Sequence, residues 1–192
     1  MHLAIIQRIM GQFLMLFSIT LLPPVVIDLF YQEGAARAFF YSYLFLLSIG
    51  FLLFLPVRSK RNDLRLRDGF VVVVLFWLVL GVAGAIPFYL YENLDISITD
   101  ALFESVSGLT TTGATVLVGL DSLPHSILFY RQELQWLGGM GIIVLAVAVM
   151  PMLGIGGMQL YKAEAPGPVK DNKLTPRIAE TAKALWCIYI LV

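Results

Sequence analysis

The chain has 192 residues, of which 59% are hydrophobic and only 14% are charged, whereas soluble domains carry about 25% charged residues. This composition excludes an ordinary soluble domain and indicates a polytopic membrane protein. The 13 basic and 13 acidic residues give a formal net charge of +0 at pH 7, so no global field would draw a nucleic acid to the chain.

Two apolar runs open the chain and predict a pair of membrane-spanning helices within residues 1–57. The first run, residues 3–22, matches the roughly 20 residues that a spanning helix needs. Pro23 and Pro24 are expected to kink its outer end. After a polar turn, residues 35–57 form the second predicted span.

A charged connector and two further spans follow. Residues 58–68 are rich in Lys and Arg, and residues 69–91 form the third apolar run. Residues 98–108 predict a helix that is too short to cross a hydrocarbon core of about 30 Å. After an irregular stretch, the fourth predicted span covers residues 132–153.

The C-terminal part predicts a linker and the beginning of another helix. Residues 154–175 are polar and rich in Gly and Pro, which indicates a cytoplasmic linker. Pro176 is predicted to open a helix, because Pro suits the first helical turn. The predicted helix of residues 176–192 becomes apolar in its second half and remains apolar at Val192. We therefore expect the chain to be part of a longer protein.

The placement of Lys and Arg predicts the orientation. One basic cluster lies in residues 58–68 and another in residues 162–177, and two predicted spans separate them. Both clusters therefore lie on one side, which the positive-inside rule makes cytoplasmic together with the N-terminus. The opposite side carries mostly acidic residues, which either concentrate cations at a pore mouth or are ordinary solvated loop residues.

Residues 98–115 predict a re-entrant hairpin. The third and fourth spans run in opposite directions, so this segment enters the membrane from outside and returns to the outside. Thr99 and Asp100 lie where polar side chains cap a helix, and Gly108 lies where helices commonly end. The C-terminus of the short helix, with roughly half a negative charge, then points toward the membrane centre and stabilises a cation there.

Residues 109–115 form a Thr-rich bend, which is the strongest functional candidate. Irregular backbone at membrane depth is tolerated only where it is buried in protein or lines a water-filled path. Thr110 to Gly113 offer carbonyl and hydroxyl oxygens that can replace the water of a cation, and Gly113 permits unusual φ and ψ values. An ordinary extracellular loop can have the same composition. The position of this bend after a half-length helix and between two spans favours an ion-selectivity filter over such a loop.

Other single residues carry weaker expectations. Glu104 is an ionisable group in the short helix; it either accepts hydrogen bonds from backbone N–H groups behind the bend or faces a wet outer vestibule. Tyr130 and Trp136 are expected in an aromatic belt at the interface, and Asp28 is expected to be interfacial. Cys187 is expected to be a buried apolar thiol.

The sequence contains no pattern that indicates an enzyme. His2 and His125 are predicted on opposite sides of the membrane and form no metal pair. The chain has no HExxH, GxSxG or Walker-type motif. We therefore expect no catalytic residues.

Two motifs together resemble a known family. The Thr-rich bend at residues 110–115, TTTGAT, is followed at residues 135–142 by QWLGGMGI. This pair resembles the Trk/Ktr/HKT superfamily of potassium transporters, most closely its bacterial TrkH-type membrane subunits, and the resemblance covers the whole chain. It implies an all-α polytopic membrane protein in which two peripheral helices precede four repeats of outer helix, pore helix, filter strand and inner helix.

The resemblance implies how the chain divides. Residues 69–153 would be the first pore repeat, and residues 176–192 would begin the second. Within the first repeat the outer helix would be residues 69–91, the pore helix 98–108, the filter 109–115 and the inner helix 132–153.

The resemblance also implies a function and partners. Backbone carbonyls of Thr111 and Thr112 would bind potassium, with Thr110 and Gly113 adjoining, and no covalent cofactor is expected. The chain would supply one of four filter strands for potassium uptake across the bacterial inner membrane, and it is not expected to conduct alone. Implied partners are the bilayer, the three remaining repeats, a second copy and a cytosolic nucleotide-binding regulatory subunit. The alternative is a non-conducting membrane scaffold or plug module.

Overall fold

The computed structural model describes residues 3–58, 66–144 and 184–191, and within these ranges every regular element is a helix. The predicted all-α class is therefore confirmed. The chain divides into two compact units, residues 1–136 and residues 137–192, and each is described by itself. Three helical stretches among the described residues are long and apolar enough to cross a membrane: Leu3–Tyr31, Ala36–Val57 and Val71–Leu90.

The first span consists of two helices, and the predicted kink is in fact a break. Helix α1 covers Leu3–Ile19 and α2 covers Leu22–Tyr31. The prediction placed the distortion at Pro23 and Pro24, but both prolines lie in the first turn of α2. Pro has no N–H to bond the carbonyl four residues earlier, so α1 must end before them, whereas Pro suits the start of a new helix.

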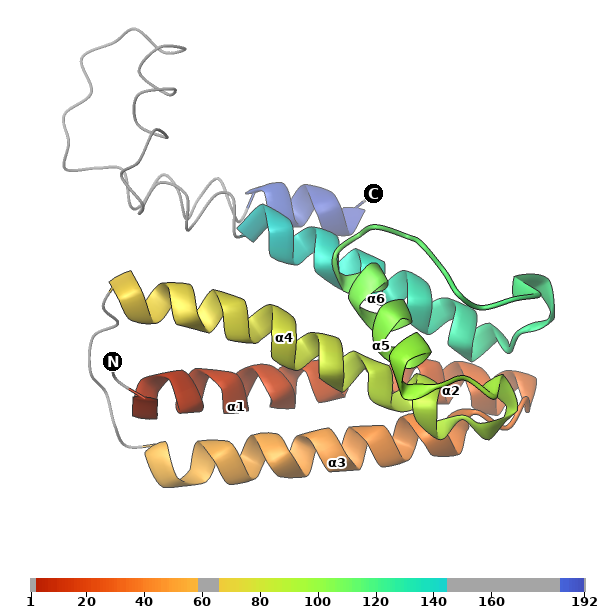
Figure 1. The fold of residues 1–192 in the computed structure, drawn as a ribbon, viewed down its shortest axis with the longest axis horizontal. Helices are drawn as coiled ribbons and strands as arrows, with labels where there is room; N and C mark the ends of the chain where they lie inside the picture. Colours follow the sequence, from red (N-terminus) through yellow and green to blue (C-terminus); the bar gives the residue numbers. More distant parts are fainter. Residues whose placement is uncertain (1–2, 59–65, 145–183, 192) are drawn as a thin grey trace, which may run out of the picture. The chain divides into compact units, whose positions relative to one another are not determined.

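Helix α3, Ala36–Phe54, runs alongside α1 (Figure 1) and continues as the short 3₁₀ helix η1, Leu55–Val57. The two helices cross at Gly11 and Gly50. A Cβ atom on Gly11 would lie 2.8 Å from the Gly50 carbonyl oxygen, and one on Gly50 would lie 2.9 Å from the Gly11 oxygen. Small residues allow this close approach of backbones, as is common between helices in membranes.

The turn between α2 and α3 is built around Asp28. Its carboxylate accepts hydrogen bonds from the N–H groups of Ala35 at 3.0 Å and Ala36 at 2.8 Å, and therefore caps α3. It also accepts a bond of 3.1 Å from the hydroxyl of Ser126. Asp28 is only 2% exposed, so its carboxylate is buried inside the protein at this turn. Three hydrogen bonds offset the cost of burying this carboxylate.

Residues 66–144 contain the helices α4, α5 and α6. Helix α4 covers Leu66–Leu90 and begins inside the predicted connector, and the 3₁₀ helix η2, Glu92–Leu94, follows it. The short helix α5 covers Ile98–Leu109 and packs against α4.

Helix α6 begins earlier than predicted. It covers His125–Val144, after the 3₁₀ helix η3 at Leu120–Ser122, whereas the inner helix was predicted from residue 132. The Pro124 carbonyl accepts bonds of 3.0 Å from the N–H groups of Ile127 and Leu128, so the chain becomes helical directly after Pro124. The rest of the predicted inner helix, the linker and residues 176–183 lie outside the described residues.

Candidate functional site

Helix α5 positions the bend, and a capping box fixes where α5 begins. Ser97 is the N-cap: its hydroxyl accepts a bond of 3.1 Å from the Asp100 N–H, and Asp100 accepts one of 3.1 Å from the Ser97 N–H. The expected capping role of Asp100 is confirmed, whereas Thr99 takes no part in the cap. The N-cap itself was missed, although Ser followed by Asp three residues later resembles the capping-box pattern.

The backbone of the bend folds back onto the last turn of α5. Each N–H group from residue 110 to residue 113 donates to a carbonyl of α5. The bonds run from Thr110 to Val106 at 2.9 Å, from Thr111 to Gly108 at 2.9 Å, and from Thr112 and Gly113 to Ser107 at 3.0 and 3.4 Å. The carbonyls of Val106, Ser107 and Gly108 are therefore paired, and the bend's own oxygens are available to a ligand.

Two residues of the bend have left-handed backbone conformations. Gly113 has φ +72°, as the sequence led us to expect, and Thr111 has φ +57°. A β-branched residue rarely adopts this region, and such strain persists only where the surroundings hold it. Here the hydrogen bond from the Thr111 N–H to Gly108 helps to hold it. No sequence signal marked Thr111 for this conformation.

The carbonyls of the bend are left free. Within the described residues, no hydrogen bond reaches the carbonyl oxygens of residues 110–113, and these four residues are exposed. The next carbonyl differs, because the Ala114 oxygen accepts a 2.6 Å bond from the hydroxyl of Ser107. The bend thus offers a short row of unpaired backbone oxygens that ends at Ala114.

Glu104 holds the segment that follows the bend. Its carboxylate accepts bonds from the Thr115 hydroxyl at 2.5 Å, from the Val116 N–H at 2.6 Å and from the Leu117 N–H at 3.3 Å. Glu104 is 3% exposed. Of the two alternatives, the structure shows the one in which Glu104 accepts backbone hydrogen bonds behind the bend, and not the one in which it faces a wet vestibule.

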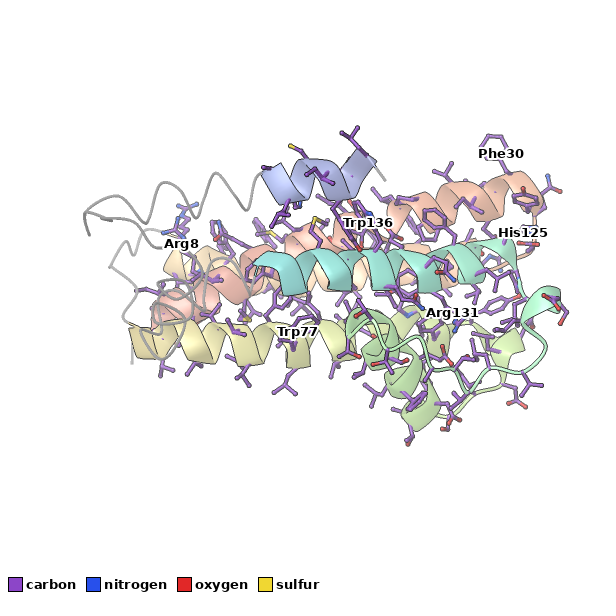
Figure 2. All side chains as sticks on the ribbon, turned by 90° about the horizontal axis from the view of Figure 1, so that it is seen from above. Arg8, Phe30, Trp77, His125, Arg131 and Trp136 are labelled. Carbon is purple, nitrogen blue, oxygen red and sulfur yellow. The ribbon has the colours of Figure 1, made fainter. Side chains whose placement is uncertain are left out.

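Arg131 completes this buried cluster. Its Nε donates to Glu104 at 3.0 Å, and the two side chains are 9% and 1% exposed. Figure 2 shows Arg131 on the side of α6 that faces α5. The sequence placed Arg131 in the outer irregular stretch, but it lies in α6 because that helix begins at His125. The ion pair joins α5 to α6, and the other hydrogen bonds of Glu104 join α5 to the segment after the bend.

Tyr130 lies in the core rather than in an interfacial belt. It is 0% exposed, and its hydroxyl donates to the Gly84 carbonyl at 3.0 Å. Its ring packs against Phe39 and Phe88, with ring centroids 5.2 and 5.1 Å away. The interfacial expectation for Tyr130 was therefore wrong, whereas Trp136 is 41% exposed.

His125 takes part in an ion pair, and Cys187 lies at the surface. His125 pairs with Glu33, with 2.7 Å between Nδ1 and Oε1, and stacks on Tyr31 with ring centroids 4.0 Å apart. Figure 2 shows His125 near the end of α2 that carries Phe30. Cys187 is exposed, so the expectation of burial was wrong. No group of three or more metal-ligating side chains occurs among the described residues.

Comparisons with known proteins give consistent results. The family model for TrkH, described as a cation transport protein, matches residues 35–192. Over 192 residues the chain is 61% identical to the Trk system potassium uptake protein TrkH of Escherichia coli K12, covering 100% of this chain and 40% of that protein. It is 45% identical over 191 residues to the Trk system potassium uptake protein TrkG of the same strain, covering 100% of this chain and 39% of that protein.

A solved structure matches the fold. The crystal structure of the potassium transporter TrkH from Vibrio parahaemolyticus superposes with a TM-score of 0.83 at 55% identity, covering 99% of this chain and 37% of that chain. The chain therefore spans about two fifths of the length of the relatives that it matches.

Proposed function

The chain belongs to the TrkH family of cation transport proteins, and from that membership we propose that it supplies one of the four filter strands of a channel-like pore for potassium uptake. Potassium is bound by the backbone carbonyls of Thr111 and Thr112, with Thr110 and Gly113 adjoining. The relatives' names, potassium uptake protein and potassium transporter, support this choice of ion.

The unpaired carbonyl row is the observation that carries the proposal. Every N–H group of residues 110–113 is used by α5, so the oxygens of these residues can face an ion. Backbone carbonyls that replace a hydration shell are the usual ligands of potassium in selective pores. Divalent Ca²⁺ usually takes carboxylate ligands, and the nearby carboxylate of Glu104 is already occupied by its four donors. The bend therefore suits a monovalent cation.

The full pore requires more than this chain. We propose that the three remaining repeats of a full-length protein complete it, in the bacterial inner membrane with the N-terminus in the cytoplasm. A second copy and a cytosolic nucleotide-binding regulatory subunit are the proposed protein partners. The family is one of cation transporters, and no catalytic residue is proposed.

The test is Gly113→Asp in the full-length protein, with rubidium uptake into liposomes as the measurement. An L-residue at φ +72° costs about 1–2 kcal/mol, and a carboxylate beside the ion row would bind cations too tightly to release them. We expect uptake to fall by about tenfold or more. The matched control is Gly34→Asp, because Gly34 has φ +87° and no atom within 4 Å of the added Cβ.

Two results would count against the proposal. Unchanged uptake by Gly113→Asp would remove the bend from the ion path. Absence of rubidium uptake by the wild-type protein would support the alternative of a non-conducting scaffold or plug module.

A further inference from the structure

We propose that Ser107 sets the outer limit of the ion-binding row by holding the Ala114 carbonyl out of it, and that this contact maintains selectivity for potassium over sodium. The inference rests on the proposed function and specifies how the same site discriminates between ions. Ser107 is a positioning residue, because it acts through the backbone of the filter strand.

Ser107 contacts the strand on both sides of Gly113. Its carbonyl accepts the N–H groups of Thr112 and Gly113, and its hydroxyl donates to the Ala114 carbonyl at 2.6 Å. Its side chain lies in the last turn of α5, and the residue is only 7% exposed. One residue thus fixes the peptide groups before and after the glycine whose left-handed conformation shapes the bend.

The bond to Ala114 separates two kinds of carbonyl. Those of residues 110–113 are unpaired within the described residues, whereas the Ala114 oxygen is occupied by a short hydrogen bond. Selectivity in carbonyl-lined filters depends on the number and field strength of the coordinating dipoles. If the Ala114 carbonyl were released, its peptide group could rotate and add an oxygen at the outer end of the row.

The neighbouring hydroxyls are engaged elsewhere and cannot replace Ser107. The Thr110 hydroxyl donates to the Val106 carbonyl at 2.8 Å and lies 2.9 Å from the Thr112 hydroxyl. The Thr115 hydroxyl donates to Glu104. In the described part of the chain, the Ser107 hydroxyl is the one hydrogen-bond donor to the Ala114 carbonyl. Loss of the Ser107 hydroxyl should therefore release the carbonyl rather than exchange its partner.

The experiment compares Ser107→Ala with Ser105→Ala in the full-length protein. Both variants delete one hydroxyl from α5, but the buried Ser105 hydroxyl has no hydrogen-bond partner in the described part of the chain and faces Gly84. The measurement is the ratio of rubidium flux to sodium flux in liposomes. We expect Ser107→Ala to lower this ratio about fivefold, the equivalent of one net hydrogen bond of about 1 kcal/mol. Ser105→Ala should leave the ratio within about twofold of wild type by the same measure.

A conservative pair separates positioning from a loss of folding. Ser107→Thr keeps the hydroxyl and should preserve most of the ratio, whereas Ser107→Cys keeps the size but donates weakly and should lower it. If Ser107→Ala does not fold, the comparison of Ser107→Thr with Ser107→Cys tests the proposal instead. Equal rubidium-to-sodium flux ratios in these two variants overturn it. Equal loss in Ser105→Ala and Ser107→Ala also overturns it.

The wild-type protein distinguishes this inference from the proposed function. Selective rubidium flux in wild type, with the same ratio in Ser107→Ala, overturns the inference about Ser107 alone. No rubidium flux in wild type overturns both.

Discussion

Glu104 illustrates how much one buried carboxylate organises at the scale of a single residue. Four donors from two segments reach it: the Arg131 guanidinium on α6, and the Thr115 hydroxyl and two backbone N–H groups on the segment after the bend. A buried charge is tolerated only when it is paired and hydrogen-bonded. Glu104 meets both conditions, so its contacts fix the strand relative to both helices.

We expect Glu104→Gln to destabilise the full-length protein. The neutral amide leaves Arg131 buried without its ion-pair partner, and breaking a buried pair costs about 3–5 kcal/mol. If the amide NH₂ group took the place of Oε1, it would face the N–H groups of Val116 and Leu117, and neither side could accept a hydrogen bond. The measurement is thermal unfolding in detergent, with Glu92→Gln as control because Glu92 is exposed. A melting temperature equal to that of wild type would show that the ion pair adds no stability.

At the scale of elements, close packing of glycines decides how the first helices meet. The Gly11–Gly50 crossing brings backbone against backbone between α1 and α3, whereas Gly81 on α4 faces the end of the Val106 side chain on α5. A side-chain methyl can move by a few tenths of an ångström, but a helix backbone cannot move without the whole helix. The two contacts should therefore tolerate an added methyl group differently.

Gly11→Ala is expected to lower stability by about 1–3 kcal/mol, as overpacking commonly does. The new Cβ would lie 2.8 Å from the Gly50 oxygen and 2.9 Å from the Phe54 nitrogen. Gly81→Ala is the control, since its Cβ would meet a Val106 methyl carbon at 3.0 Å. Thermal unfolding of both variants measures the difference. Equal melting temperatures would mean that α1 and α3 separate easily.

Local patterns predicted elements where the decisive contacts are local. The short length of α5 and the place of the Thr-rich bend followed from residues 98–115 alone. The start of α6 was missed because residues 125–131 include His, Ser and Arg, which resemble a loop, although Arg131 is buried by its partner on α5. The bond from Val116 to Glu104 spans 12 positions around a reversing bend, so no periodicity could reveal it. The Ser107–Ala114 bond and the conformation of Thr111 depend on the same reversal.

At the scale of the whole molecule, the N-terminal helices α1 to α3 are joined to the start of α6 within the unit of residues 1–136. Asp28 accepts the Ser126 hydroxyl, and Glu33 pairs with His125, so the α2–α3 turn contacts the first turn of α6 twice. The rings of Phe39 on α3 and Tyr130 on α6 continue the contact into the core. These contacts let the helix pair support the start of α6.

Asp28→Ala should cost more stability than Ser126→Ala. The first change leaves the N–H groups of Ala35 and Ala36 without their cap and Ala35 is 0% exposed. An unsatisfied buried donor costs about 1–3 kcal/mol. Ser126→Ala removes one bond worth about 1 kcal/mol and leaves the cap of α3 in place. Thermal unfolding compares the two, and the reverse order would contradict the capping role of Asp28.

The Gly11–Gly50 crossing also bears on the order in which the protein is made. Its contacts lie wholly within residues 3–58, and domains generally fold from the N-terminus during synthesis. The first two spans can therefore pair as a hairpin before residues 66–144 leave the ribosome. Asp28 would already cap α3 at that stage. The hydrogen bond from Ser126 can form only after Ser126 is translated, 98 residues later. The nascent hairpin therefore already contains the acceptor that will bind the start of α6.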